Sequence, residues 1–201
     1  MRKNTEVIVY KNSQKRFAAR HVIYFITTNT HKGFPYFAED IFCESFLDDL
    51  EFSKESKHFK LYGYKINNEH IHFLIQPFGE FSYSEIMHNL KRVSSLHINQ
   101  IIKGPEVYSL VEWTEKLKEY RLRFITKHGK NPHFRKFKWQ PSFVDHMIRG
   151  RADFLEHIKY IRNQWIKHNQ PLNKYCYIDE NLKPEPSDYG IPISSNKSPS
   201  S

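Results

Sequence analysis

The sequence predicts an α+β fold, in which helices cover one face of an antiparallel sheet. Two observations favour this class. Segments rich in β-branched and aromatic residues alternate with segments whose apolar residues recur at helical spacing, and a short Asn67-Asn68 turn joins two of the predicted strands. A length of 201 residues and a hydrophobic fraction of 39% suit a single globular domain with tails.

The first half of the chain contains the most regular elements. Three segments have the β-branched and aromatic composition of strands: residues 21–30, 59–66 and 70–77. Residues 39–56 carry apolar side chains at helical spacing, and a second helix, capped by Ser82 or Ser84, is expected to reach about residue 102. The resulting order β-α-β-β-α matches the ferredoxin-like split arrangement, whose helices cover one face of the sheet.

The second half begins where Gly104-Pro105 interrupts the helical pattern. A helix is expected within the basic segment that follows, at about residues 110–126, and residues 139–148 have the character of a strand. Residues 151–168 form the last predicted helix. Its apolar stripe has i, i+4, i+7 and i+11 spacing and consists of Phe154, Ile158, Ile161 and Trp165.

Composition predicts the domain organisation and excludes several classes of protein. We expect a basic N-terminal arm over residues 1–20, a domain over 21–180 with a basic insertion at 103–138, and a flexible Pro/Ser-rich tail over 181–201. No apolar run has the ~20 residues that a membrane span needs, and no signal peptide is recognisable, so a cytoplasmic protein is expected. Cys43 and Cys176 are too far apart to indicate a disulfide framework or a zinc cluster.

The net charge of +9 favours a polyanionic partner, although a generally basic soluble protein would show the same balance. Residues 103–138 contain ten Lys and Arg against four Glu, with aromatic residues between them. Cations that follow a backbone and rings that stack on bases are typical of proteins that bind single strands, but some of these rings are also expected in the core. The candidate nucleic-acid-binding residues are Arg135, Lys136, Lys138, Trp139 and Arg149.

The pair His70-Ile71-His72 is the main chemical signal of the sequence. Alternate side chains of a strand share a face, so both imidazoles point one way while Ile71 is buried on the other side. Two neutral imidazoles are half of a metal site. With twelve histidines in the chain, roughly 0.7 such pairs are expected by chance, so the pair needs support from elsewhere.

That support lies about ninety residues downstream. Tyr160 and Gln164 are four residues apart on the flank of the last apolar stripe, where a phenol and an amide oxygen could reach a metal on a neighbouring strand. Taken alone, Tyr160 would more often be a boundary residue, and Gln164 a solvated side chain.

Four features together resemble the REP-associated tyrosine transposases, a group of one-tyrosine HUH enzymes that act on single-stranded DNA. These features are His70-Ile71-His72, the Tyr160-x-x-x-Gln164 helix, the stretch WQPSFVDHMIR at residues 139–149, and the stretch GYKI at residues 63–66. Within the third stretch, Asp145 and His146 are expected to hydrogen-bond inside the fold, with substrate positioning as the alternative.

The resemblance implies a transposase that cleaves and rejoins DNA through a covalent 5′-phosphotyrosine, at hairpins of palindromic repeats. It implies Tyr160 as the nucleophile, and His70, His72 and Gln164 as ligands of a divalent metal, Mg²⁺ or Mn²⁺. Single-stranded DNA would be the partner, and the protein would be a monomer or a homodimer. Two alternatives stay open: an HUH nicking endonuclease with the same site, and a domesticated nucleic-acid-binding protein that does no chemistry.

Overall fold

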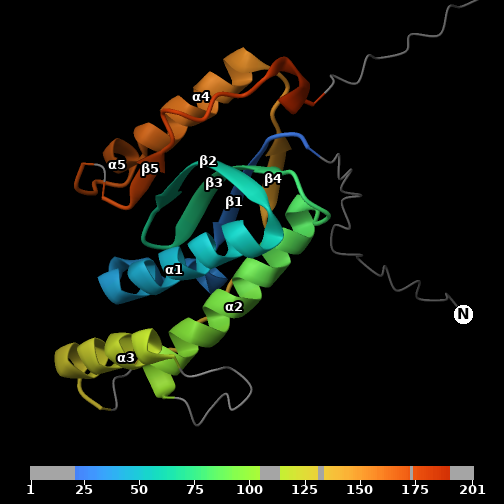
Figure 1. The fold of residues 1–201 in the computed structure, drawn as a ribbon. Coiled ribbons are helices and arrows are strands. Elements are labelled where there is room, and N and C mark those ends of the chain that lie inside the picture. The colour runs from blue at the N-terminus through green and yellow to red at the C-terminus, as the bar shows by residue number, and fades with distance from the viewer. Residues whose placement is uncertain (1–20, 105–113, 131–133, 173, 191–201) are drawn as a thin grey trace, which may run out of the picture.

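A computed structural model describes residues 21–104, 114–130, 134–172 and 174–190. Within these ranges it contains five strands: β1 (Tyr24–Asn29), β2 (Phe59–Ile66), β3 (His70–Pro77), β4 (Val144–Met147) and β5 (Cys176–Ile178). The strands form one sheet in the order β4-β1-β3-β2-β5, and every neighbouring pair is antiparallel (Figure 1). β3, which carries both histidines, is therefore the central strand.

Helices lie on both sides of this sheet (Figure 1). The α-helices are α1 (Asp40–Lys57), α2 (Tyr83–Lys103), α3 (Glu115–His128), α4 (Arg151–Arg162) and α5 (Gln164–Lys167). Three short 3-10 turns are η1 (His31–Gly33), η2 (Tyr36–Ala38) and η4 (Pro186–Asp188). α1 and α2 cover one face, α3 packs on these two helices, and α4 covers the opposite face.

The predicted α+β fold with an antiparallel sheet is confirmed, and in the β1-α1-β2-β3-α2 half the helices lie on one face, as expected. The one-face description does not extend to α4. The reason lies in β3, where Phe73 and its alternate neighbours face α1 and α2 while Leu74 faces α4. A strand that is apolar on both sides needs cover on both sides.

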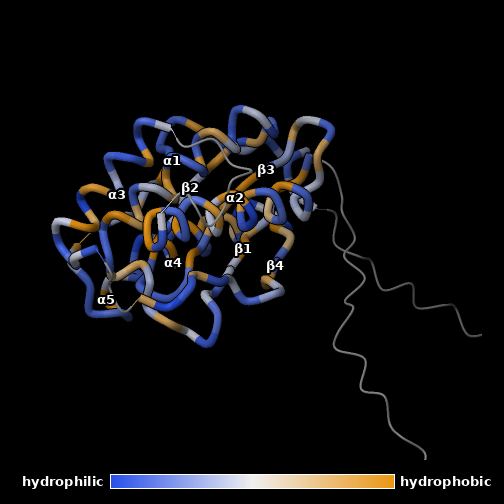
Figure 2. The backbone as a smooth tube through the Cα atoms, turned by 90° about the horizontal axis from the view of Figure 1, so that it is seen from below, coloured by the Kyte–Doolittle hydropathy of each residue, from blue (hydrophilic) through white to orange (hydrophobic). Residues whose placement is uncertain are grey.

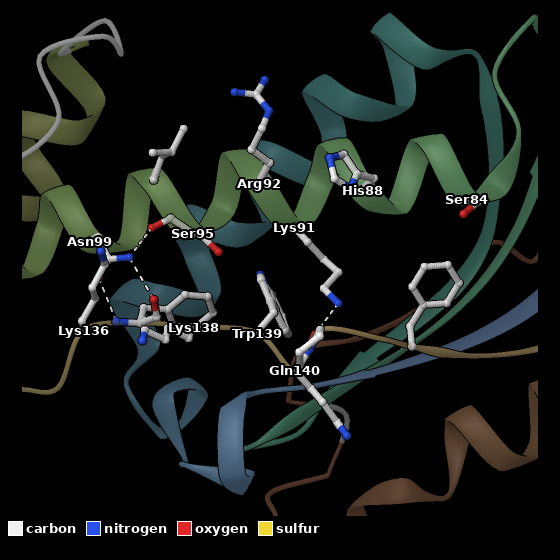
Figure 3. A pocket seen from close by; sticks show the side chains of 14 residues that line it. Ser84, His88, Lys91, Arg92, Ser95, Asn99, Lys136, Lys138, Trp139 and Gln140 are labelled. Atoms are coloured by element: carbon white, nitrogen blue, oxygen red, sulfur yellow. Dashed lines mark hydrogen bonds between the residues drawn. The ribbon is translucent and has the colours of Figure 1, made fainter. Parts of the chain in front are cut away.

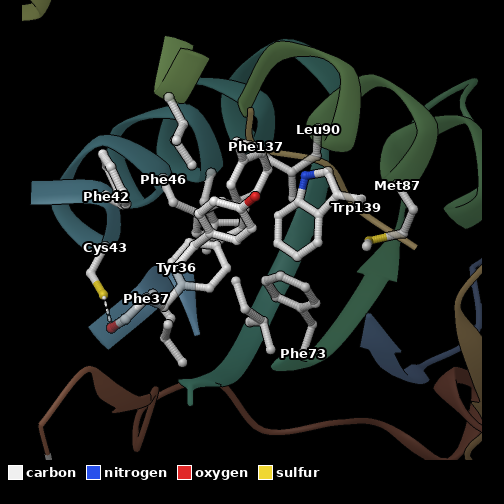
Figure 4. Close-up of a cluster of buried hydrophobic side chains, with 14 of the residues drawn as sticks. Tyr36, Phe37, Phe42, Cys43, Phe46, Phe73, Met87, Leu90, Phe137 and Trp139 are labelled. Atoms are coloured by element: carbon white, nitrogen blue, oxygen red, sulfur yellow. Dashed lines mark hydrogen bonds between the residues drawn. The ribbon is translucent and has the colours of Figure 1, made fainter. Parts of the chain in front are cut away.

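The larger core lies between the sheet and α1, α2 and α3 (Figure 4). Phe137 and Trp139 enter it from the segment before β4, with their ring centroids 5.2 Å apart and their planes nearly perpendicular. The smaller core, under α4, consists of Ile23, Tyr62, Leu74, Ile148, Phe154 and Ile161. In Figure 2, apolar positions lie mainly toward the centre of the molecule and polar positions mainly toward its outside.

Gly63 on β2 allows the close approach of β5. A Cβ atom at this position would lie only 2.9 Å from the carbonyl oxygen of Tyr177 on β5, whereas the side chain of Ile161 on α4 would lie at an ordinary contact distance of 3.7 Å. The pairing of β5 with β2 therefore favours a residue without a side chain at this position.

The predicted boundaries of β2 and β3 agree with the structure, and Ser82 caps α2 in a capping box with Glu85. The predicted strand at residues 139–148 is shorter, because only 144–147 form β4 and Trp139 makes an isolated bridge with Thr30. Pro141 lies between these two parts and has no N–H to donate to a ladder.

The C-terminal region differs from the prediction. β5 was not predicted, and residues 181–190, assigned to the tail by composition, pack on the domain. Gln76 donates to Asp188 at 2.6 Å, and the backbone N–H of Gly190 donates to the carbonyl of Ile148 at 2.8 Å. Residues 1–20, 105–113 and 191–201 lie outside the described residues. No helix in the described ranges is both long and apolar enough to cross a membrane.

Candidate active site

His70 and His72 lie at the start of β3, on the sheet face that α4 covers. Glu69 accepts a hydrogen bond from Nδ1 of His70 at 2.8 Å, and the Thr27 hydroxyl on β1 lies 2.8 Å from Nδ1 of His72. The two Nε2 atoms therefore remain in the space between the rings, where they lie 3.1 Å apart. A partner on Nδ1 that leaves Nε2 toward a ligand is the usual arrangement of a metal-binding histidine.

Both imidazoles are kept neutral by their surroundings. Burial lowers the pKa of His70, although Glu69 acts in the opposite direction. Burial also lowers the pKa of His72 to about 3, with a smaller contribution from His70, while a hydrogen bond with Gln164 acts against this shift. Neutral imidazole is the form that binds a metal.

Tyr160 lies beside these histidines, near the end of α4. Its ring meets the ring of His72 edge-on, with centroids 5.1 Å apart, and it makes a similar contact with Phe25 on β1 at 5.7 Å. The side chain is 39% exposed. Nζ of Lys167 on α5 lies 5.9 Å from the ring centroid. The phenol is thus held against the imidazoles and remains open to a ligand.

Gln164 also reaches this place, but from a different helix. The predicted helix at residues 151–168 is interrupted at Asn163, whose φ of −97° and ψ of 5° end α4, and Gln164 begins α5. Gln164 is buried at 2% exposure, so the alternative of a solvated side chain is wrong. Its Oε1 accepts a long hydrogen bond of 3.4 Å from Asn67.

Two residues of the site were missed in the sequence. Asn67, which the sequence assigned only to a turn, is buried and donates to Nε2 of His70 at 2.9 Å. His168 follows α5, and its ring lies edge-on to that of His70, with centroids 4.8 Å apart. The spacing Tyr160-x-x-x-Gln164-x-x-x-His168 is a signal that could have found His168, because such positions share a helix face.

The candidate nucleic-acid-binding residues divide into two groups. Arg135, Lys136, Lys138 and Arg149 are exposed. Trp139 is only 8% exposed, and its Nε1 donates to Ser94 at 3.0 Å, so the prediction that its ring binds nucleic acid needs correction. The large ring packs in the core and is therefore not available to stack on a base.

The segment around Lys138 runs beside the histidines. The carbonyl of Lys138 accepts from the N–H of His31, and Gln140 pairs with Asn29 through both backbone and side chain. Asn29 lies directly opposite His70 in the β1–β3 register. Side chains at opposite positions share a face, and alternate residues do so along an extended segment. Exposed Lys138 and Gln140 therefore lie at the sheet edge on the side of His70.

Many rings and cations in the rest of the basic insertion stabilise the packing of α3, although they were predicted to bind nucleic acid. Of its predicted stacking rings, Tyr120, Phe124 and Phe137 are buried. The cations of α3 mostly face acceptors on neighbouring elements: Lys116 pairs with Asp48, Arg123 with Glu44, Lys127 with Glu39, and Arg121 donates to the carbonyls of Ile101 and Ile102. Much of the positive charge in this insertion thus holds α3 against α1 and α2.

A groove of about 610 Å³ lies between α2 and the segment that precedes β4 (Figure 3). Arg92 and Lys138 are exposed residues of its lining, whereas Phe137 and Trp139 are buried. Lys91 spans the groove, where it donates to the carbonyl of Gln140 at 2.6 Å. The groove thus offers exposed cations next to rings that are buried in the core.

A second group of titratable side chains ties α4 to the sheet edge. Asp153 on α4 lies 2.9 Å from Nε2 of His146 on β4 and 3.1 Å from Nδ1 of His157, and the two imidazole rings are stacked 4.9 Å apart. Tyr83 donates to Asp145 at 3.0 Å. The expectation that Asp145 and His146 hydrogen-bond within the fold is confirmed. One ligand atom from each of His146, Asp153 and His157 lies within 4.8 Å of the others, which is close enough for a metal ion.

Comparisons with known proteins found similar solved structures. No curated protein matches the chain. A solved structure of a REP-associated tyrosine transposase bound to a REP hairpin is similar over 79% of this chain and 74% of that one, with 16% identity and a TM-score of 0.48. A structure described as a candidate transposase from Deinococcus radiodurans R1 is similar over 82% and 98%, with 16% identity and a TM-score of 0.42.

The family of IS200-like transposases matches residues 21–104, from the start of the domain to the end of α2. This region includes His70 and His72, whereas Tyr160 and Gln164 lie beyond it. The resemblance to transposases that the sequence predicted is therefore confirmed, since residues 21–104 match the model of the IS200-like transposase family.

Proposed function

We propose that this protein is a metal-dependent transposase that cleaves and rejoins single-stranded DNA through a covalent bond to Tyr160. The observation that carries the proposal is the contact between a partly exposed phenol and His72, one of two adjacent imidazoles. The Tyr160 ring lies 5.1 Å from that of His72, whose Nε2 lies 3.1 Å from Nε2 of His70. A nucleophile beside a metal site is the arrangement that phosphodiester transfer needs.

The residues at this place fit a divalent cation. Two imidazole nitrogens and the Gln164 amide oxygen form a mixed N/O set, and Oδ1 of Asn67 is buried without a hydrogen-bond partner among the described residues. His70, His72 and Gln164 would hold the cation, either Mn²⁺, which the nitrogen ligands favour, or the more abundant Mg²⁺. When bound, the cation supplies Lewis-acid polarisation of the scissile phosphate.

The residues of the chain then carry out the transfer. The Tyr160 hydroxyl gives up its proton, and its oxygen forms a bond to phosphorus as the bond to the 3′ oxygen breaks. The 3′ oxygen takes up a proton and leaves as a hydroxyl, while the 5′-phosphate stays on Tyr160. Attack by a 3′-hydroxyl of another strand reverses the step and frees Tyr160. Nζ of Lys167 lies 5.9 Å from the centroid of the Tyr160 ring, so a positive charge is present beside the phenol during this step.

Single-stranded DNA that forms hairpins is the substrate we propose, because of the family match and the resemblance in the later motifs. The exposed cations Arg135, Lys136, Lys138 and Arg149 would contact its phosphates. Lys138 lies at the sheet edge on the histidine side, so a strand that leaves the site toward this edge would meet a cation.

The proposal is tested by incubating the full chain and Mn²⁺ with single-stranded oligonucleotides from the flanks of its own gene. Wild-type protein should acquire a DNA adduct that survives denaturing electrophoresis. Tyr160→Phe should form none, because it lacks the nucleophilic oxygen, and should bind the same DNA as well as wild type. Tyr177→Phe is the matched control, since Tyr177 is 41% exposed against 39% for Tyr160 and lies outside the site.

The same gels separate the alternatives. Cleavage by Tyr160→Phe at the wild-type rate would make water the nucleophile and leave a hydrolytic nuclease. An adduct without later joining to a second strand would indicate a nicking endonuclease. DNA binding without cleavage or adduct in the wild type would indicate a binding protein that has lost the chemistry.

A further inference from the structure

His168 places a third imidazole in the site, next to that of His70. Its ring lies edge-on to that of His70, with centroids 4.8 Å apart and planes at 62°. It is held there by α5, since its backbone N–H donates to the carbonyl of Gln164 at 3.0 Å. Gln164 and His168 are thus one helical turn apart, opposite the strand that carries His70 and His72.

The Nε2 atom of His168 is buried and has no hydrogen-bond partner in the described part of the chain. Buried polar atoms are nearly always paired, and an exception in a native protein commonly marks a water or an ion. Oδ1 of Asn67, which is next to the same His70, shares this condition. Two unpaired polar atoms around one imidazole indicate that this site is built for something that the protein chain alone does not supply.

His168 contacts one of the predicted ligands directly, since its ring lies edge-on to that of His70. His70 in turn lies beside His72, with the two Nε2 atoms 3.1 Å apart. An imidazole nitrogen with an available lone pair at this place can help to bind a cation that the two residues hold.

We propose that His168 is a fourth protein ligand of the divalent cation, through Nε2. The inference rests on the proposed function, because it concerns the cation assigned there to His70, His72 and Gln164. It adds the residue that directly follows α5, so that β3 supplies two ligands and α5 with its C-terminal flank supplies the other two.

This ligand set predicts the metal preference. Three imidazole nitrogens and one amide oxygen suit Mn²⁺, Co²⁺, Ni²⁺ or Zn²⁺ better than Mg²⁺, which prefers oxygen. Zn²⁺ with four protein ligands commonly forms a closed structural site, so Zn²⁺ should bind tightly and leave no position for a phosphate. We therefore expect Mn²⁺ or Co²⁺ to support activity, and Zn²⁺ to inhibit it.

The test measures metal binding directly in the full-length protein. Mn²⁺ affinity is determined by calorimetry, and the ligand field is followed by the visible absorption of bound Co²⁺. His168→Phe keeps a ring beside His70 but removes both nitrogens, and it should weaken Mn²⁺ binding about tenfold or more and change the Co²⁺ spectrum. His88→Ala is the control, because it removes an exposed imidazole far from the site along α2.

Two further measurements prevent a false assignment. Mn²⁺ binding is also measured in His70→Ala and His146→Ala. Binding that persists in the first variant but is lost in the second belongs to the cluster of His146, Asp153 and His157, and it is subtracted from the total Mn²⁺ binding. Histidine-labelled wild-type protein is also titrated with Zn²⁺ in an NMR experiment, where Nε2 of His168 should shift with those of His70 and His72. This second experiment needs no variant and so does not depend on the folding of His168→Phe.

The outcomes distinguish this inference from the proposed function. Weaker binding by His168→Phe with a shifted Nε2 resonance supports the fourth ligand. Unchanged affinity and spectrum in His168→Phe, or an unshifted His168 resonance, overturns the fourth ligand and leaves the site of His70, His72 and Gln164 intact. Wild-type protein that binds neither Mn²⁺ nor Co²⁺ at this site overturns the inference and the proposed metal site together.

Discussion

Three exposed cations beside the sheet edge are expected to account for a measurable part of the DNA affinity. Arg135, Lys136 and Lys138 are exposed, and the carbonyl of Lys138 is fixed to the N–H of His31 next to the strand that pairs with β3. Neutralising them together as Arg135→Gln, Lys136→Gln and Lys138→Gln removes three positive charges. It leaves Phe137 and Trp139, the buried rings between and after them, in place.

The magnitude follows from counterion release on single strands. Each phosphate contact contributes about 0.7 to the slope of log affinity against log salt, so losing three contacts should flatten the slope by about 2. A fourfold rise in salt would then weaken the wild-type affinity by about 15-fold more than that of the variant. The assay is fluorescence anisotropy of a labelled single strand, titrated at several salt concentrations.

α3 offers a matched control with the same change in charge. Lys116, Lys118 and Arg123 are also partly exposed, but each pairs with a carboxylate. Because these cations are already neutralised within the protein, their replacement by glutamine should change the slope by less than about 0.7. Equal slopes in the wild type and the first variant, or an equal flattening in both variants, would refute the assignment of residues 135–138 to the DNA contact.

Three further outcomes are expected. His72→Ala should abolish cleavage while strand affinity stays within about tenfold, as measured by gel shift, because affinity depends mainly on phosphate contacts elsewhere; cleavage that continues in excess chelator would contradict this. Burial alone would raise the pKa of Asp153, but hydrogen bonds, including one with His146, outweigh it and hold the pKa below its usual value. Asp153 thus stabilises the fold above its unfolded pKa and loses this effect as the pH falls through its folded pKa. The stability of Asp153→Asn should therefore fall less steeply with decreasing pH than that of the wild type. Identical acid transitions in the two proteins would argue against the interaction. Gly63→Ala should lower the free energy of unfolding by about 1 to 3 kcal/mol in urea titrations, because its Cβ would lie 2.9 Å from the Tyr177 carbonyl oxygen; an unchanged midpoint would show that β5 gives way without penalty.

Sequence periodicity predicted the part of the site that depends on regular structure. His70 and His72 share a face because strands alternate, and Tyr160 and Gln164 come close because they are one helical turn apart, even though the helix is interrupted between them. Asn67 could not be predicted in this way, since a turn residue has no periodic face and its contact with His70 depends on the path of the chain.

Charge was harder to interpret than periodicity. The cations of the basic insertion suggested a nucleic-acid surface, but the sequence does not show that carboxylates of α1 lie opposite α3. Trp139 was misassigned for a similar reason, because an aromatic residue among cations has the same composition whether its ring is exposed or buried. Pairing across elements that are distant in the chain is a tertiary property, and composition alone does not reveal it.

The interruption at Asn163 separates Tyr160, the proposed nucleophile, from the proposed ligands that follow it. Tyr160 belongs to α4, which is anchored at the sheet edge through Asp153 and His146, while Gln164 belongs to α5. In a continuous helix, any displacement of the tyrosine would carry Gln164 along with it. Under the proposed function, a joint at Asn163 would let DNA attached to Tyr160 move toward a second strand while the proposed ligand Gln164 stays with the sheet. Strand exchange would then require only a change in the backbone angles at Asn163. The proposed metal ligands would keep their positions between the two chemical steps.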